Sequence, residues 1–409
     1  MMTVRKHALA GTHRLIPPAE TLERARRVMP ELGITRIANV TGLDTLGIPV
    51  VMVVRPNARS LSVSQGKGVT LEAARASGLM EAIEFAHAEH IDQPLRLGSL
   101  EELRATCPVV DVSLLPRRDR GPFSPHLRTL WIAGVNVLER RPTWVPYELV
   151  HMDYTLPLPP GSGSFLMSSN GLASGNHPLE ALNHALCELI ERDATTRFRF
   201  SSDAAQRQLR VDLSTVDDPD CRELLERYER AGVEVAVWEL TSDIGVAAFS
   251  CVIVDRDPDP SRPLGPMGGI GCHPCRAIAL SRALTEAAQS RLTVITGARD
   301  DLLHQNVWTP EENLALARKR RDELAAHPPE RSFRDAPDFR SETFNEDAAF
   351  LLEHVRAVGV REVIVVDLTR PHLGIPVVRV IAPGLEPLND IPGYVPGPRA
   401  SRWLRERAS

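Results

Sequence analysis

The sequence is poor in the features that mark secreted and membrane-spanning proteins. It has six cysteines in 409 residues, which is too few for a disulfide framework and is typical of reduced thiols. Its N-terminus, MMTVRKHALAGTHRLIPPAE, lacks the apolar core of a signal peptide. No apolar run approaches the roughly 18 residues that span a bilayer. We therefore expect a cytoplasmic protein with no membrane association.

Charge and aromatic content give no reason to expect a nucleic-acid partner. The formal net charge is −5 and aromatic residues make up 5% of the chain. No basic stretch is interleaved with aromatic residues. The hydrophobic content of 43% is ample for a sizeable core. The length allows either several domains or one large α/β unit.

Apolar segments alternate with helical patterns, which predicts a mixed α/β (α+β) fold. Three long patterns predict helices at residues 70–90, 179–198 and 277–295, with Thr70 as the N-cap of the first. Each helix follows a glycine-marked segment that we expect to be a loop: SQGKG (64–68), SSNGLASGN (168–176) and GGIG (268–271). The spacing of about 100 residues between these units indicates a weak internal repeat that is too long for a solenoid.

Shorter patterns complete the expected layout. Strands are predicted at residues 48–55, 129–138, 142–150, 233–240, 246–255, 361–368 and 375–382, and helices at residues 221–232, 310–326 and 346–358. The proline- and arginine-rich stretch 92–126 is expected to be a connecting segment. The proline-punctuated stretch 387–409 is expected to be extended or loosely held.

Polar side chains recur at helical spacing on each of the three long helices. The stripes are Ser77, Glu81 and Glu84 on the first, Glu180, His184, Glu188 and Glu191 on the second, and Arg282, Glu286 and Gln289 on the third, with Arg291 beside it. The simplest interpretation of any one stripe is a solvated helix face. That interpretation is weaker for the second helix, because neighbouring carboxylates repel one another and the stripe itself contains no lysine or arginine.

A carboxylate cluster of this kind suits Mg²⁺, which prefers oxygen ligands and often bridges carboxylates to nucleotide phosphates. Two or more ions would neutralise a triphosphate during phosphoryl transfer. The glycine segments would let backbone N–H groups and helix N-termini approach phosphates. Lys67 is a candidate phosphate or substrate contact, with an exposed loop lysine as the alternative. No Walker A or protein-kinase motif occurs, so any ATP site must be of another type.

Taken together, three segments resemble the motifs of the YcaO family. They are GKGVTLEAARASGLMEAIE, SSNGLASGNHPLEALNHALCELIERDA and GGIGCHPCRAIALSRALTEAAQSR, and the resemblance runs from about residue 35 to residue 386. It implies mixed sheets flanked by helices, with the repeated helix units around a central nucleotide and metal cleft. We therefore divide the chain into an N-terminal segment (1–40), a catalytic domain (41–386) and a proline-rich C-terminal tail (387–409).

The resemblance also implies an ATP pocket unrelated to P-loops, in which glutamates hold the Mg²⁺ ions. Carried over by motif, the metal ligands or their neighbours would be Glu81, Glu84, Glu180, Glu188, Glu191 and Glu286. The nucleotide contacts would be Lys67, Ser77, Asn170, Glu191, Arg192, Gln289 and Arg291. Two departures matter: Phe85 stands where the first motif usually has arginine, and Pro274 follows His273 where the third motif usually has an acidic residue nearby. Cys272 and Cys275 have redox or metal spacing, but we interpret them as ordinary thiols because no second CxxC exists.

The reaction that the resemblance implies is ATP-dependent activation of a backbone amide in a ribosomal precursor peptide. A nucleophile adds to the amide carbon, ATP phosphorylates the oxyanion, and phosphate leaves, so that the protein mainly positions groups and neutralises charge. We find no convincing nucleophile set in the sequence, and we interpret His184 as a packing or supporting residue. A side-chain nucleophile would give an azoline, an amine an amidine, and sulfide a thioamide.

The runs GTHRLIPPAETLERAR and VVDLTRPHLGIPVVRVIAPGLE are similar to the TfuA-associated, thioamide-forming branch of the family. The C-terminal end also continues past its prolines, unlike the tails typical of azoline-forming members. We therefore favour thioamidation, with a TfuA-like or separate leader-binding protein as partner and a homodimer as a family-level expectation. An azoline-forming cyclodehydratase or a macrocyclic amidine-forming enzyme is the alternative. A non-catalytic nucleotide-binding scaffold is the second alternative.

Overall fold

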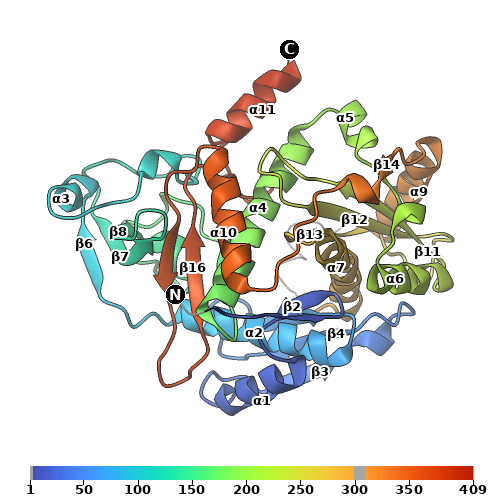
Figure 1. Ribbon diagram of the computed structural model, residues 1–409, viewed down its shortest axis with the longest axis horizontal. Helices are drawn as coiled ribbons and strands as arrows, with labels where there is room; N and C mark the ends of the chain where they lie inside the picture. Colours follow the sequence, from blue (N-terminus) through green and yellow to red (C-terminus); the bar gives the residue numbers. More distant parts are fainter. Residues whose placement is uncertain (1–2, 299–308, 409) are drawn as a thin grey trace.

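The computed structural model describes residues 3–298 and 309–408 and has the predicted mixed α/β (α+β) fold, with sheets flanked by helices (Figure 1). The expectation of mixed sheets was wrong, because the described sheets of three or more strands are antiparallel throughout. The largest sheet has the order β6-β7-β15-β16-β9, with β8 also paired to β7. The strands are β6 (Leu95–Gly98), β7 (Thr129–Asn136), β8 (Arg141–Pro146), β9 (Leu172–Ser174), β15 (Ile364–Asp367) and β16 (Val377–Ile381). Across these described ranges, no helix has the length and apolar character that crossing a membrane requires.

Two units elsewhere in the chain repeat one order of elements, three antiparallel strands followed by a helix. The first is β3 (Arg36–Asn39), β4 (Val50–Val54), β5 (Val63–Lys67) and α2 (Leu71–Glu89). The second is β11 (Val233–Glu239), β12 (Ala248–Asp255), β13 (Met267–Cys272) and α7 (Arg276–Thr296). The weak repeat in the sequence therefore corresponds to a structural repeat in its first and third units only. The middle unit differs, because its strand β9 belongs to the largest sheet.

The glycine-marked segments before α2 and α7 are strands, so the prediction of loops there was wrong. A Cβ atom on Gly66 of β5 would lie 2.0 Å from the carbonyl oxygen of Ala74. A Cβ atom on Gly269 of β13 would lie 2.3 Å from the carbonyl oxygen of Ala283. Glycine at these positions lets each helix rest directly on the backbone of the preceding strand. Its role here is close packing rather than chain reversal.

The long helices predicted from the sequence are confirmed. Thr70 caps α2, because its side chain accepts a hydrogen bond of 3.2 Å from the amide of Ala73. The other helices with predicted counterparts are α4 (Pro178–Phe200), α6 (Pro219–Arg230), α9 (Pro310–Ala326) and α10 (Phe344–Ala357). The stretch 92–126 is more structured than expected, since it contains β6 and the capped helix α3 (Leu100–Arg104).

Each of the three site helices buries its apolar side in a different hydrophobic cluster. Ile83 of α2, Leu186 of α4 and Leu284 of α7 are fully buried, each in its own cluster. Figure 1 shows α4 running through the middle of the molecule, with α7 beside it. Because the apolar sides face separate cores, the polar sides of these helices are left to face a shared space.

The N-terminal segment forms the hairpin β1 (His7–Leu9) and β2 (Thr12–Arg14), helix α1 (Pro18–Val28) and strand β3. Since β3 pairs with β4, the expected boundary at residue 40 falls within one sheet. A buried ion pair of 2.5 Å between Lys6 and Asp347 of α10 ties the start of the chain to the body.

The C-terminal stretch is anchored, so the expectation of an extended or loosely held tail was wrong. It contains helix α11 (Pro398–Ala408), whose Arg399 pairs with the buried Asp193 of α4 at 2.9 Å. Glu386 accepts hydrogen bonds from the amides of Gly397 and Ala400. These anchors join residues distant in sequence, and a local pattern of prolines does not reveal them.

Candidate active site

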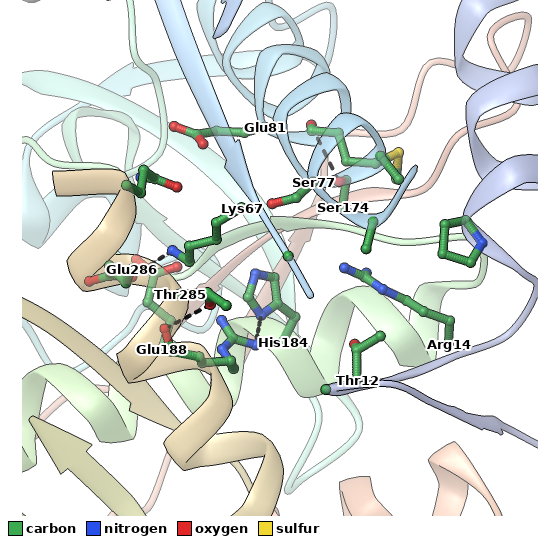
Figure 2. A pocket seen from close by; sticks show the side chains of 18 of the residues that line it. Thr12, Arg14, Lys67, Ser77, Glu81, Ser174, His184, Glu188, Thr285 and Glu286 are labelled. Carbon is green, nitrogen blue, oxygen red and sulfur yellow. Dashed lines mark hydrogen bonds and ion pairs between the residues drawn. The ribbon is translucent and has the colours of Figure 1, made fainter. Parts of the chain in front are cut away.

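A cavity of about 340 Å³ lies where α2, α4 and α7 meet the hairpin β1–β2 (Figure 2). Its main polar lining residues are Thr12, Arg14, Lys67, Ser77, Glu81, Glu84, Ser174, His184, Glu188, Glu191, Arg192, Ser281, Arg282, Thr285, Glu286 and Gln289. The three polar stripes of the sequence therefore converge largely on one cavity. They are not separate solvated faces.

Glu84 is held at the wall between α2 and β9. Its carboxyl group accepts hydrogen bonds of 2.7 Å from both the amide and the hydroxyl of Ser174. Burial raises the pKa of Glu84 to about 8, and the neighbouring carboxylates of Glu81 and Glu188 add to the increase. Unless a metal ion binds beside it, this carboxyl group is therefore largely protonated at neutral pH.

Glu188 and Glu191 lie one helical turn apart on α4. Burial raises the pKa of both carboxyl groups, and the adjacent Arg192 opposes the increase. The Arg192 guanidinium lies 3.8 Å from Glu188 and 3.4 Å from Glu191. Arg192 therefore partly offsets the repulsion between these two carboxylates, although it lies just outside the polar stripe of α4.

Lys67 projects from the end of β5 toward Glu286 of α7, as Figure 2 shows, and its Nζ lies 2.6 Å from the Glu286 carboxylate. Burial acts to raise the pKa of Glu286, but Lys67 and Arg192 together bring it below its ordinary value. The Lys67 side chain is 21% exposed. Lys67 is therefore a cavity residue and not an exposed loop lysine.

Arg282 and Arg14 also line the cavity, although neither was predicted to be a metal ligand or a nucleotide contact. Arg282 Nη1 donates a hydrogen bond of 3.1 Å to Nδ1 of His184. Burial, together with Arg282, keeps the pKa of His184 well below its ordinary value, so the imidazole is neutral. Arg282 lies on the polar stripe of α7, so its place in the cavity could have been predicted from helical spacing. No local pattern predicts the place of Arg14, because it depends on how the hairpin β1–β2 docks.

Glu180, which we predicted as a metal ligand, does not line the cavity. Its carboxylate is 4% exposed and lies 3.2 Å from the guanidinium of Arg14. It also accepts hydrogen bonds from the amides of Leu15 and Asn176. Glu180 therefore anchors the hairpin β1–β2, because its carboxylate oxygens accept hydrogen bonds from these donors.

Arg291 and Asn170, predicted as nucleotide contacts, also lie outside the cavity lining. Arg291 is 1% exposed and pairs with Asp44 at 2.9 Å and with Asp255 at 2.8 Å. These ion pairs hold α7 against the end of β12 and against the segment that precedes β4, so the position of Arg291 is structural. Asn170 lines a second, smaller pocket.

The lining carboxylates fit magnesium ions. Burial and mutual repulsion raise the pKa of Glu84, Glu188 and Glu191, and a divalent cation would remove that penalty. Within residues 3–298 and 309–408, no three His, Cys, Asp or Glu side chains already surround one point as a metal site. Phosphate oxygens and water would therefore have to complete the coordination shell, which is usual for Mg²⁺.

Comparison with known protein families and curated sequences gives consistent matches. Residues 65–386 match the family described as YcaO cyclodehydratase, ATP- and Mg²⁺-binding. The chain is 37% identical over 382 residues to an uncharacterized protein in the tfuA 3′ region of Rhizobium leguminosarum bv. trifolii, covering 91% of this chain and 88% of the relative. It is 36% identical over 377 residues to an uncharacterized protein of Methanothermobacter thermautotrophicus, covering 91% and 94%.

Two solved structures share the fold. A heterocyclase in complex with substrate and cofactor superposes with a TM-score of 0.78 at 23% identity, over 99% of this chain and 57% of that chain. The structure of YcaO from Methanopyrus kandleri, bound with AMPPCP and Mg²⁺, superposes with a TM-score of 0.72 at 25% identity, over 94% and 95%. The likeness to the heterocyclase concerns the fold alone.

Proposed function

Because the chain belongs to the YcaO family of ATP-dependent enzymes, we propose that it uses ATP and Mg²⁺ to activate a backbone amide of a ribosomally made peptide. One observation carries this proposal: carboxylates from α2, α4 and α7, far apart in sequence, converge on one cavity. The raised pKa values of Glu84, Glu188 and Glu191 mean that this part of the cavity favours protons or cations. A nucleotide with its metal ions supplies the cations and phosphates that such a cavity fits.

We assign the lining residues to two groups. Glu81, Glu84, Glu188, Glu191 and Glu286 would hold Mg²⁺, which neutralises the phosphate charge when bound. Lys67, Ser77, Arg192 and Gln289 would contact the nucleotide, together with Arg14 and Arg282. Glu180 and Arg291 are left out of both groups, because their polar atoms are engaged in the anchoring contacts described above.

The chemistry requires the protein to position groups rather than to form a covalent bond with the peptide. A nucleophile adds to the amide carbon, the amide oxygen takes the γ-phosphoryl group of ATP, and the C–O bond then breaks to release phosphate. The cavity cations stabilise negative charge on the transferring phosphoryl group. His184 does not activate a serine here, because its Nδ1 accepts a hydrogen bond from Arg282.

We propose further that sulfide is the nucleophile, that a thioamide is the product, and that a TfuA-like protein is the partner. The support is the similarity, over most of both chains, to a protein named for its position 3′ of tfuA. The C-terminal residues 390–408 also contribute nothing to the cavity lining, and α11 packs on α4 instead. The azoline- and amidine-forming reactions remain the alternatives that an experiment must separate.

The test is to incubate the purified protein and a TfuA-like partner with candidate precursor peptides, ATP and Mg²⁺, with and without sulfide. We expect a peptide heavier by the difference between sulfur and oxygen, formed only when sulfide and ATP are both present. A peptide lighter by one water would instead indicate an azoline or amidine. Peptide binding with no ATP consumption under any condition would support the scaffold alternative and overturn the proposal. A Glu188→Gln variant serves as the inactive control.

A further inference from the structure

A second pocket, of about 40 Å³, shares a wall with the main cavity. Ser168 and Asn170 line the small pocket, whereas Ser169 between them lines the cavity. On α4, Glu188 faces the cavity and the next residue, Leu189, lines the small pocket. A single segment of backbone on one side and one helix on the other therefore separate the two spaces.

The small pocket contains a buried cation that forms no ion pair with the residues that the structure describes, although the charge of Glu188 across the wall acts to raise its pKa. Arg379, in the middle of β16, is 2% exposed. Its Nε donates to the carbonyl oxygen of Leu149 at 2.8 Å and its Nη2 donates to that of Ser168. Its Nη1 is buried and has no hydrogen-bond partner within the described ranges. Burial lowers the pKa of Arg379 to about 10, so the guanidinium is still charged at neutral pH.

The same pocket also offers an unused acceptor. Asn170 Oδ1 is buried and, like Arg379 Nη1, meets no hydrogen-bond partner in the part of the chain that the structure describes. The other lining side chains are almost all apolar, including Leu166 and Leu189. A charged donor and an acceptor left unsatisfied in an apolar pocket are costly unless a ligand or water completes them.

We propose that this pocket binds hydrosulfide beside the reaction cavity, and that the ion leaves the pocket for the cavity before it attacks the amide carbon. The inference rests on the proposed thioamidation and names where that reaction takes up its sulfur. A volume of about 40 Å³ is too small for a nucleotide or a peptide segment but suits a small monovalent anion. Apolar walls suit a weakly hydrated anion, Arg379 Nη1 would donate to the sulfur, and Asn170 Oδ1 would accept the S–H.

The step balances without a further reactant. Hydrosulfide forms a C–S bond to the amide carbon, and the electron pair of the C=O π bond moves to the oxygen. That oxygen takes the γ-phosphoryl group while ADP leaves. The C–O bond then breaks, the S–H proton departs with the phosphate, and C=S remains. The sum is amide, hydrosulfide and ATP giving thioamide, ADP and hydrogen phosphate.

The first test detects the anion without requiring turnover. Crystals of the full chain are soaked in bromide, which has the charge and nearly the size of hydrosulfide, and anomalous diffraction locates the ion. We expect a peak in the small pocket of the wild-type protein and none there in Arg379→Met. A pocket that holds water only, or bromide bound at surface sites as an adventitious ion only, would overturn the inference.

The second test separates sulfide uptake from nucleotide binding in the complete thioamidation assay. Asn170→Ala removes the acceptor, and Ala382→Leu fills the pocket with Arg379 kept in place. We expect KM for hydrosulfide to rise about tenfold in each, as loss of a hydrogen bond to a charged ligand predicts, with KM for ATP unchanged. The matched control is Arg55→Lys, since Arg55 is equally buried but paired with Glu89, and it should leave KM for hydrosulfide unchanged.

The outcomes distinguish this inference from the proposed function. If thioamide forms but neither pocket variant changes KM for hydrosulfide, the function stands and the pocket assignment falls. If the wild-type protein makes an azoline or amidine instead, the proposed thioamidation fails, and the hydrosulfide assignment fails with it even where bromide binds. An Arg379 variant that does not fold leaves the decision to Asn170→Ala and Ala382→Leu.

Discussion

Glu84 and Ser174 connect α2 to β9 through two hydrogen bonds of 2.7 Å, across 90 positions of sequence and at the wall of the cavity. Both bonds favour the charged carboxylate, yet burial still raises the pKa of Glu84 to about 8. The cavity thus positions carboxyl groups accurately while making their charged forms unfavourable. Such a site is prepared for cations, because binding a cation relieves the penalty.

Replacing Glu84 with glutamine should flatten the pH dependence of stability in magnesium-free buffer. Between its ordinary pKa of 4.5 and about 8, folded wild-type protein retains a proton that the unfolded chain has released. The contribution of this group to stability is therefore fully present below pH 4.5 and is lost as pH rises through about 8, with a slope of at most about 1.4 kcal/mol per pH unit. Urea denaturation across this window measures the free energy of unfolding of both proteins.

The control for that measurement is Glu72→Gln, on the same helix but exposed to solvent. It should keep the wild-type pH dependence. Added Mg²⁺ should stabilise wild-type protein at the alkaline end of the window more than it stabilises Glu84→Gln. Identical pH profiles for wild-type and Glu84→Gln would show that the carboxyl group is ionised throughout.

Glu188→Gln and Glu180→Gln should affect different properties, the first the rate of turnover and the second the stability of the fold. Glu188→Gln should reduce ATP-dependent turnover about 100-fold, because a metal-binding carboxylate is lost. It should not lower the melting temperature, because burial already makes that charge unfavourable. Glu180→Gln should lower the melting temperature, because the hairpin loses its ion pair with Arg14. Equal loss of turnover with no change in melting temperature in both variants would restore Glu180 as a metal ligand.

The sequence was sufficient to predict the three site helices and most of the main polar residues that line the cavity. Helical spacing is a local property, so Glu81, Glu188 and Glu286 could each be assigned to a polar helix face before their convergence was known. Convergence itself depends on how the helices pack, which no local pattern specifies. That the three helices surround one cleft was predicted only from the resemblance to the YcaO family.

Other features could not be read from local patterns. Gln289 and Arg291 stand two positions apart on α7, and only packing shows that the first lines the cavity and the second pairs with buried carboxylates. The glycines of β5 suggested a loop because close strand–helix contact and chain reversal both favour glycine. The docking of Arg14 and α11 depends on long-range ion pairs with no local signal.

Arg291→Met should destabilise the protein while leaving the cavity chemistry intact. The substitution leaves Asp44 and Asp255 without their shared cation, and breaking a buried ion pair costs about 3–5 kcal/mol. KM for ATP in the remaining folded protein should not change. Gln289→Ala is the matched comparison on the same helix, and it should raise KM for ATP with little loss of stability. A large increase in KM for ATP in Arg291→Met, without unfolding, would return Arg291 to the nucleotide site.

Gly66→Ala should force β5 away from α2 and so displace Lys67, the next residue. The added Cβ would lie 2.0 Å from the carbonyl oxygen of Ala74 and 2.2 Å from the amide nitrogen of Gly78, and these are backbone atoms that cannot swing aside. Overpacking of this kind costs about 1–3 kcal/mol or more. The melting temperature should therefore fall, and affinity for Mg²⁺–ATP should fall with it, because Lys67 no longer reaches Glu286. Gly42→Ala is the control, since nothing lies within 4 Å of a Cβ there, and it should change neither quantity. A Gly66→Ala protein with wild-type stability would mean that strand and helix have room to separate, and the close contact would then not be what places the lysine.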